Sequence, residues 1–317
     1  MRVLVTGASG YIGRFLLEAL ADAPGAQHEH EVHAAYGSDV AFAREFGALC
    51  ASVSPLDLCD AAAVAELVRT IRPEVVVHLA AISAPLACER DPATCASVNE
   101  PTCLLDAIVT HAPAARLINF SSDQVYAGRA TADRLYAEDM PAVPVNEYGR
   151  SKLRFERVVE SRLGAAAISL RCSLVLGPKA RGNCKKQTFL QFALSALEKT
   201  EPRIDAFDNE YRCAVDVADV VACLQLLIAS WPVSHAGVYN LGGPQRLTRA
   251  DIALAVVAAA APGREGCVVP THRDAAQFEV VSPADICLDS SRLVELTGLQ
   301  RSSLEQTVRR ALRLWNR

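Results

Sequence analysis

The chain has 317 residues, of which 51% are hydrophobic and 21% charged, and its formal net charge is -4. This length suits one large or two closely joined domains with a substantial core, and the acidic balance argues against nucleic acid as the main partner. No apolar run reaches the about 18 residues that a membrane-spanning helix needs. Because "MRVLVTG" already reads as a strand and turn, it leaves no room for a targeting peptide, and we expect a soluble cytoplasmic protein with no membrane partner.

The first half alternates short apolar runs with amphipathic helical patterns. Strands are predicted at 2–6, 31–37, 75–81, 116–122 and 166–177, and helices at 11–22, 61–71, 103–112 and 148–163. A long polar loop covers 123–146. Strands without polar alternation, separated by helices, indicate an α/β fold with a doubly wound parallel sheet of the Rossmann type. Its ligand site is expected at the carboxyl ends of the strands.

After Gly177 this alternation of strands and helices ends. A basic loop and a helix occupy 178–199, a strand and a helix occupy 212–230, and a late strand is predicted at 237–243. Two further helices are predicted at 248–261 and 303–315. We therefore predict a dinucleotide-binding Rossmann domain over residues 1–177, to which part of 212–243 returns. Residues 178–317 would mainly form a small α/β substrate-binding domain.

Cysteine and histidine patterns give no metal site. The eleven cysteines are scattered from Cys50 to Cys287 with no C-x-x-C, and an odd number cannot pair completely within the chain. Reduced thiols are expected. The run "HEHEVH" at residues 28–33 matches no standard metal spacing, so we interpret it as a loop that leads into a strand.

The stretch "TGASGYIG" places Gly7, Gly10 and Gly13 between the first strand and the first helix. Glycines allow a sharp turn and a close approach of the backbone to a pyrophosphate, and the helix N-terminus supplies free N–H groups. The strand before and the helix after are the context in which this pattern predicts dinucleotide binding.

The adenosine end is predicted from the tip of the second strand, "AAYGSD". NAD-binding proteins usually carry an acidic residue at this tip, but Asp39 comes two or three residues later. Without an acid at the tip a 2'-phosphate is tolerated, and Arg14 or Arg44 could provide its positive charge. We therefore predict NADP, with NAD as the alternative. Asp57 would meet the adenine amine.

The stretch "YGRSK" places Tyr148 and Lys152 four residues apart, on one face of a predicted helix. A nearby ammonium lowers a phenol pKa from its usual value of about 10, which makes tyrosine usable in proton transfer. Alone, the pair would more often be a solvated helix surface. The strand that ends in Ser121 and Ser122 supplies hydroxyls for the same substrate oxygen, and the order of these motifs favours chemistry.

These motifs, together with "HLAA" at 78–81 and Asn99 in "SVNEPT", resemble the extended short-chain dehydrogenase/reductases. The resemblance implies that Ser122, Tyr148 and Lys152 form a catalytic triad. With the glycine loop, it gives the following cofactor-binding residues: Gly7, Ser9, Gly10, Tyr11, Ile12, Gly13, Arg14, Asp57, Leu58, Leu79, Ala80, Ala81, Asn99, Tyr148 and Lys152.

The runs "SSDQVYAG", "AEDMPAVPVNEYGRSK" and "CLDSSRL" resemble one branch of that superfamily. It holds dTDP-4-dehydrorhamnose reductases and the regulatory beta subunit of methionine adenosyltransferase, and it implies a site role for Asp123. The first hypothesis is an NADPH-dependent reductase of a 4-keto nucleotide sugar or related carbonyl. The second is a regulatory subunit that docks on the methionine adenosyltransferase catalytic subunit, with "RRALRLWNR" as the candidate docking segment. A nucleotide-sugar epimerase or dehydratase is the third, and a homodimer is compatible with all three.

The chain differs from the reductases at substrate-facing positions. Leu86 and Ala87 stand where those enzymes usually have Asp and Lys, Ser282 stands where they have Arg, and Gln124 replaces a common aromatic residue. Several basic residues could instead face a substrate pyrophosphate: Lys179, Arg181, Lys185, Lys186 and Arg212.

Overall fold

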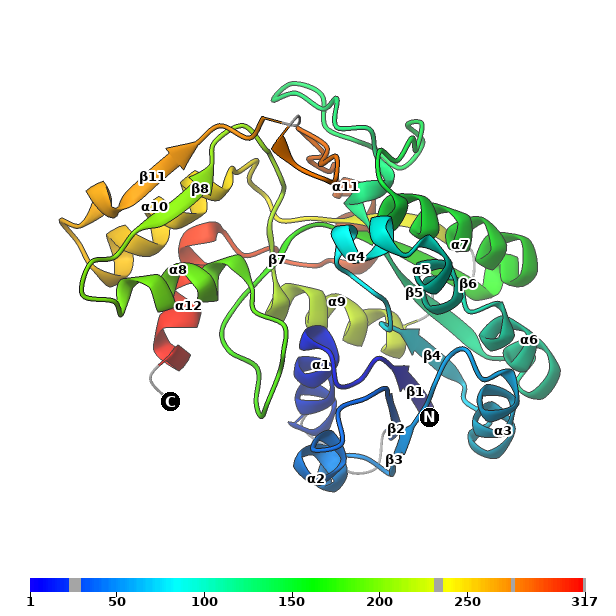
Figure 1. Ribbon diagram of the computed structural model, residues 1–317. Helices are drawn as coiled ribbons and strands as arrows, with labels where there is room; N and C mark the ends of the chain where they lie inside the picture. Colours follow the sequence, from blue (N-terminus) through cyan, green and yellow to red (C-terminus); the bar gives the residue numbers. More distant parts are fainter. Residues whose placement is uncertain (23–29, 231–235, 275–276, 316–317) are drawn as a thin grey trace.

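The computed structural model of the chain describes residues 1–22, 30–230, 236–274 and 277–315. Its centre is a seven-stranded sheet in which every neighbouring pair is parallel, in the order β10-β6-β5-β4-β1-β2-β3 (Figure 1). The strands are β1 (Arg2–Thr6), β2 (Glu31–Tyr36), β3 (Ser52–Pro55), β4 (Val75–His78), β5 (Arg116–Ser122), β6 (Ala167–Cys172) and β10 (Gly237–Leu241).

Helices cover both faces of this sheet, which confirms the predicted doubly wound fold. One face packs against α1 (Tyr11–Asp22), α2 (Phe42–Phe46), α9 (Val217–Ala229) and α11 (Ser291–Thr297). The other face packs against α3 (Ala61–Ile71), α6 (Thr102–His111) and α7 (Glu147–Leu163). The central strands are buried on both sides, as all four residues of β4 show, and such burial explains their unbroken apolar sequences.

A separate hydrophobic cluster lies beside the carboxyl end of the sheet (Figure 1). Its elements are α8 (Phe189–Leu197), β8 (Ile204–Phe207), α10 (Arg249–Ala260), β11 (Val268–Thr271) and α12 (Leu304–Trp315). The two strands β8 and β11 pair with each other in parallel. A second short pair, β7 (Val175–Leu176) and β9 (Val215–Asp216), lies where the chain passes between the two clusters. The small helices α4 (Pro85–Arg90) and α5 (Pro92–Asn99) follow β4.

Other predictions have mixed outcomes. Segment 79–81 is not strand, because β4 ends at His78 and the chain turns toward α4. All eleven cysteines are free thiols. Within the described ranges, no helix is long and apolar enough to cross a membrane, and no group of three or more His, Cys, Asp or Glu side chains is placed to hold a metal ion. His28 and Glu29 of the histidine-rich run lie outside the described residues.

Candidate active site

A cavity of about 770 Å³ opens at the carboxyl end of the sheet. Residues that directly follow or end neighbouring strands line it: Gly7 after β1, Leu79 after β4, Ser122 on β5 and Cys172 on β6. In a doubly wound sheet this edge is where ligands bind. A second cavity of about 570 Å³ also has Gly7 in its wall and extends toward the ends of β2 and β3. Together they give an elongated site on both sides of the glycine loop.

At two positions the glycine loop leaves no room for a side chain. Gly7 has a φ of +69°, and a Cβ there would lie 2.5 Å from the backbone nitrogen of Ala80. A Cβ on Gly13 would lie 2.5 Å from the carbonyl oxygen of Ala8. The loop ends at the N-terminus of α1, whose first N–H groups suit a pyrophosphate. This cradle fits the dinucleotide that the sequence predicts.

The second cavity has the features of an adenosine site. It is lined by the predicted residues Asp57, Leu58 and Ala80, and also by Tyr36 and Pro55 from the ends of β2 and β3. The Asp57 carboxylate accepts a hydrogen bond from the Cys59 N–H at 2.9 Å, which fixes its orientation. Gly37 and Ser38 complete the wall at the tip of β2.

Arg14 is not available to a 2'-phosphate. Its guanidinium is fully buried, donates to Asp39 at 2.5 Å and to Glu45 at 2.8 Å, and lies over the ring of Phe46. Its remaining N–H groups donate to the carbonyl oxygens of Ser9, Arg181 and Asn183. The Arg14 guanidinium therefore anchors loop 181–183 to the Rossmann core, and a contact between Arg14 and the cofactor stays a prediction.

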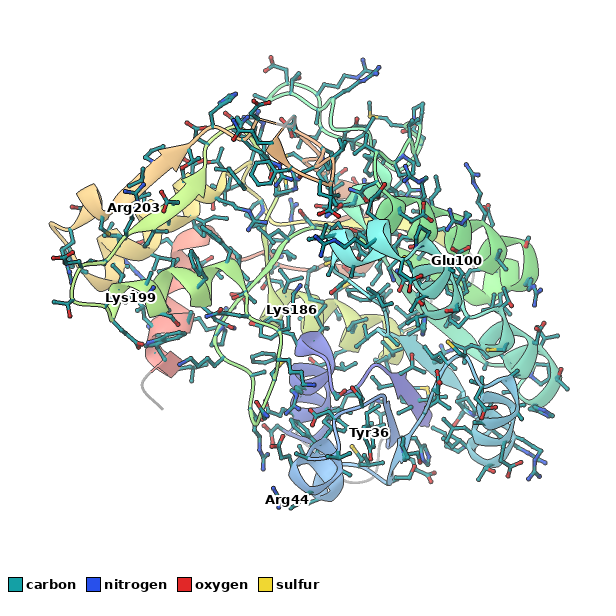
Figure 2. All side chains as sticks on the ribbon, in the orientation of Figure 1. Tyr36, Arg44, Glu100, Lys186, Lys199 and Arg203 are labelled. Atoms are coloured by element: carbon teal, nitrogen blue, oxygen red, sulfur yellow. The ribbon has the colours of Figure 1, made fainter. Side chains whose placement is uncertain are left out.

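Arg44 lies outside the wall of the adenosine cavity. It is exposed on α2 (Figure 2). Neither arginine named from the sequence lines the adenosine cavity, and Gly37 and Ser38 are the lining residues at the tip of β2.

Ser122 and Tyr148 meet in the first cavity. Ser122 ends β5 and Tyr148 lies in the first turn of α7, and both side chains are buried and line the cavity wall. Burial raises the pKa of Tyr148 above its ordinary value, and a hydrogen bond with Ser122 opposes that shift. The phenol is therefore protonated at neutral pH and can donate a proton.

Lys152 lies one turn after Tyr148 and lines the same cavity. Its ammonium donates to the carbonyl oxygen of Phe120 at 2.9 Å. Burial lowers the pKa of Lys152 to about 8, although the nearby Glu156 carboxylate opposes this shift. The sequence predicted that Lys152 lowers the tyrosine pKa. In this structure burial dominates, and the net direction for Tyr148 is upward.

Asp123 follows Ser122 and is also buried in the cavity wall. It accepts a hydrogen bond from the Ser173 hydroxyl at 2.9 Å and from the Ser122 hydroxyl at 3.1 Å. Burial raises its pKa, while Arg212 and these hydroxyls oppose the shift. Asp123 therefore orients the serine that faces Tyr148.

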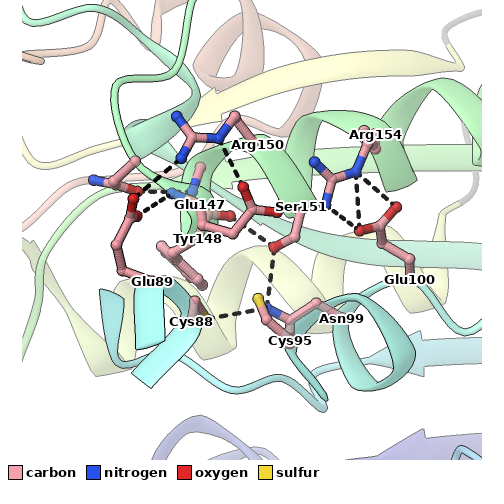
Figure 3. A network of polar contacts seen from close by, with 12 residues as sticks. Cys88, Glu89, Cys95, Asn99, Glu100, Glu147, Tyr148, Arg150, Ser151 and Arg154 are labelled. Carbon is pink, nitrogen blue, oxygen red and sulfur yellow. Dashed lines mark hydrogen bonds and ion pairs between the residues drawn. The ribbon is translucent and has the colours of Figure 1, made fainter. Parts of the chain in front are cut away.

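Asn99 does not line either cavity, and its contact with the cofactor stays a prediction. Its buried amide accepts from the Ile82 N–H at 2.7 Å and donates to the Ser151 hydroxyl at 3.1 Å (Figure 3). Ser151 in turn donates to the Tyr148 carbonyl at 2.8 Å. Asn99 thus links the chain after β4 to the turn of α7 that carries the tyrosine, and acts as a positioning residue.

Most of the residues predicted to bind the cofactor line one of the two cavities. The walls of the two cavities contain these predicted cofactor residues: Gly7, Gly10, Tyr11, Ile12, Gly13, Asp57, Leu58, Leu79, Ala80, Ala81, Tyr148 and Lys152. Ser9 is outside both walls. Of the basic loop, Lys186 lines the first cavity, whereas Arg181 faces Phe46 and Lys179 lies 3.8 Å from the ring centre of Trp315.

Several wall residues had no signal in the sequence analysis. They come from segments distant in the chain: Ser173, Thr188, Phe189, Phe192, Phe207, Glu210, Arg249, Arg273, Val280 and Val281. Arg212 and the substituted positions Leu86, Gln124 and Ser282 were singled out and do line the cavity.

The sheet, the glycine cradle and the Ser-Tyr-Lys set define a Rossmann-type, dinucleotide-binding class of protein. The profile of the family described as RmlD substrate binding domain matches residues 1–316. The chain therefore belongs to that family.

Relatives within the family carry two kinds of name. A dTDP-4-dehydrorhamnose reductase of Burkholderia thailandensis is 29% identical over 95% of this chain and 94% of its own length. Methionine adenosyltransferase 2 subunit beta of Xenopus laevis is 30% identical over 80% of this chain and 71% of its own length.

Solved structures share the fold. dTDP-4-dehydrorhamnose reductase from Bacillus anthracis, in complex with NADP, superposes with a TM-score of 0.78 over 98% of both chains at 22% identity. UDP-glucose 4-epimerase of Thermus thermophilus, in complex with NAD, gives a TM-score of 0.80 at 23% identity over 100% of this chain and 99% of its own. These similarities support the Rossmann architecture.

The glycine cradle gives a first testable prediction. Gly7→Ala should lower the free energy of unfolding by about 1–3 kcal/mol, because the positive φ and the contact with Ala80 both strain the variant. It should also weaken NADPH binding, measured by calorimetric titration. Gly47→Ala is the matched control, since no atom lies within 4 Å of the added Cβ. Equal NADPH affinity in wild type and Gly7→Ala would contradict the assignment.

The buried lysine gives a second prediction. Between pH 8 and 10.5 the folded Lys152 loses its proton while the unfolded chain still holds it, so the wild type gains stability as the pH rises. Relative to Lys152→Met, the gain across this window should be about 3 kcal/mol. Urea unfolding of both proteins at several pH values measures it, and other titrating groups cancel in the comparison. A difference that does not change with pH would show that the ammonium is not desolvated.

Proposed function

We propose that this chain is an NAD(P)H-dependent reductase of the carbonyl group of a nucleotide sugar, of the dTDP-4-dehydrorhamnose reductase type. The observation that carries the proposal is the pairing of Ser122 with a protonated Tyr148 in the cavity that the glycine loop also lines. The reductase relative in Burkholderia thailandensis, aligned over nearly the whole of both chains, supports this choice. We place the protein with the short-chain dehydrogenase/reductases and in the cytoplasm.

The cofactor, when bound, supplies a hydride for the carbonyl carbon. Tyr148 holds the proton that the carbonyl oxygen needs to become a hydroxyl. In the free protein Asp123 accepts from Ser122, and Asn99 donates to Ser151 in the turn that carries Tyr148. With substrate bound, the Ser122 hydroxyl would turn from Asp123 and donate its hydrogen bond to the same carbonyl oxygen. Lys152 adds a positive charge that supports the cofactor ribose and the negative charge that develops as the proton leaves.

The part of the chain beyond Gly177 would supply the substrate side. The elements α8, β8 and α10 place aromatic and basic side chains in the far wall of the cavity. We infer that residues 178–317 mainly form the substrate-binding domain, while β10 and α9 complete the Rossmann core.

Turnover tests the proposal directly. Tyr148→Phe should reduce NADPH oxidation with a dTDP-4-keto sugar by about 10²–10⁴-fold, because the proton donor is lost. NADPH affinity should be retained. Ser122→Ala should also reduce turnover, whereas Ser121→Ala should reduce it far less, since the Ser121 hydroxyl donates to Glu156. Full activity of Tyr148→Phe would refute the reductase assignment.

A second candidate is a dinucleotide-binding regulatory subunit of methionine adenosyltransferase, which the beta-subunit relative favours. The C-terminal helix does not form a free tail as far as Trp315. Val308 and Ala311 are buried, and the Trp315 indole donates to Glu198 at 2.8 Å. A regulatory subunit would therefore have to dock through another surface.

Gel filtration with a methionine adenosyltransferase catalytic subunit separates the two candidates. A reductase should elute separately at micromolar concentration and turn over sugar substrate. Co-elution without turnover of any nucleotide sugar would favour the regulatory role.

A further inference from the structure

The half of the cavity away from the glycine loop combines aromatic rings with guanidinium groups. Its aromatic residues are Phe189 and Phe192 on α8 and Phe207 on β8. Three arginines from separate segments line the same wall: Arg212, Arg249 and Arg273. Aromatic faces beside fixed positive charge suit a ligand that has a planar ring and an oxyanion.

Two of the three arginines already have hydrogen-bond or ion-pair partners within the chain. Arg212 donates to the carbonyl oxygens of Tyr211 at 2.7 Å and Pro283 at 2.9 Å, and to the Ser282 hydroxyl at 3.2 Å. Arg273 pairs with Glu210 at 3.2 Å and donates to the Val280 carbonyl at 3.0 Å. Most of their hydrogen-bonding capacity shapes the wall itself.

Arg249 is different. Among the residues that the structure describes, it has no hydrogen bond or ion pair, and its guanidinium lies over the ring of Phe189 at 5.1 Å. Stacking on a ring face orients a guanidinium while its edge N–H groups stay available. Arg249 is half-buried, whereas Lys186, another basic residue of the wall, is exposed, so water compensates the Lys186 charge more fully.

The local environment disfavours a positive charge at position 249 in three ways. Arg249 is the first residue of α10, where the helix dipole is positive. Burial lowers its pKa, and repulsion from Arg212 and Arg273 adds to that shift, although Glu210 and Asp123 oppose it. A positive charge that destabilises the folded protein is expected at a site where a bound anion neutralises it.

We propose that Arg249 is the residue that binds the phosphate oxyanion of the substrate, with the attached ring against the aromatic wall. The inference rests on the proposed function and deepens it, since it assigns substrate recognition to a side chain that is otherwise unpartnered. The ligand class is a nucleoside diphosphate. Free inorganic pyrophosphate carries the same oxyanions as a nucleoside diphosphate, so the experiment must distinguish these two ligands.

The test titrates UDP, dTDP and inorganic pyrophosphate into wild type, Arg249→Gln and Arg264→Gln, each saturated with NADPH. Saturation occupies the cofactor's own phosphate sites. Arg264 is exposed in the same part of the chain and outside the cavity wall, so its variant is a matched loss of one charge. Arg249→Gln should weaken nucleoside diphosphate binding about 10- to 100-fold, the loss typical of a charge-assisted hydrogen bond, and leave NADPH affinity unchanged.

Stability gives a second readout that a merely structural arginine would not produce. Because Arg249→Gln removes a charge that the free protein does not compensate, its melting temperature without ligand should equal or exceed that of the wild type. A structural role predicts a decrease instead. Arg264→Gln should match the wild type in melting temperature and in all affinities.

The outcomes separate this inference from the proposed function. Equal diphosphate affinity in wild type and Arg249→Gln would overturn the inference while nucleotide binding stands. If the wild type binds pyrophosphate through Arg249 but no nucleoside diphosphate, the oxyanion site stands and the nucleotide-sugar function fails. If the wild type binds neither, or if Arg249→Gln loses NADPH affinity to the same extent, the inference is wrong.

Discussion

The site depends on one line of buried polar side chains along α7. Tyr148, Lys152 and Glu156 are spaced by four residues, lie on one face of the helix, and are all buried. Lys152 donates to a β5 carbonyl, while Glu156 accepts from Ser121 of β5 and, at 2.8 Å, from Arg171 of β6. Buried charges must be paired with good geometry. Their partners therefore fix the position of α7 along both strands, and with it the distance between Tyr148 and Ser122.

The same rule separates arginines that build the fold from one that faces a ligand. Arg14 and Arg171 are buried, and carboxylates and ring faces in the chain compensate their charges. Each joins segments far apart in sequence, so each contributes to the architecture. Arg249 has the ring face without the carboxylate. A charged residue in a glycine-loop helix was a reasonable cofactor ligand on sequence grounds, but Arg14 is buried and paired with two carboxylates of the chain, which gives it a structural role.

The core of the fold was predictable because its signals are local. The bounds of β1, α1, α3 and β5 agree with the apolar runs and amphipathic patterns. Gly7 and the Ser-Tyr-Lys set could be found because their geometry follows from strand ends and from helix spacing. The pair β8 and β11 could not, since each strand is four residues long and they are joined across more than sixty residues. Asn99 was recognised, but its actual partner Ser151 is fifty-two residues away, and no periodicity reports such a contact.

The positions that differ from the reductase pattern change how positive charge is distributed in the cavity wall. Ser282 stands where an arginine was expected, and its hydroxyl accepts a hydrogen bond from Arg212. That bond holds Arg212 in the wall and reduces what it can offer a ligand. Leu86 makes the facing side of the cavity apolar. Positive charge that these positions no longer provide is instead present at Arg249, on an element that the alignment of motifs does not include. Recognition of an anion can therefore persist in this cavity although the residues usually associated with it have changed.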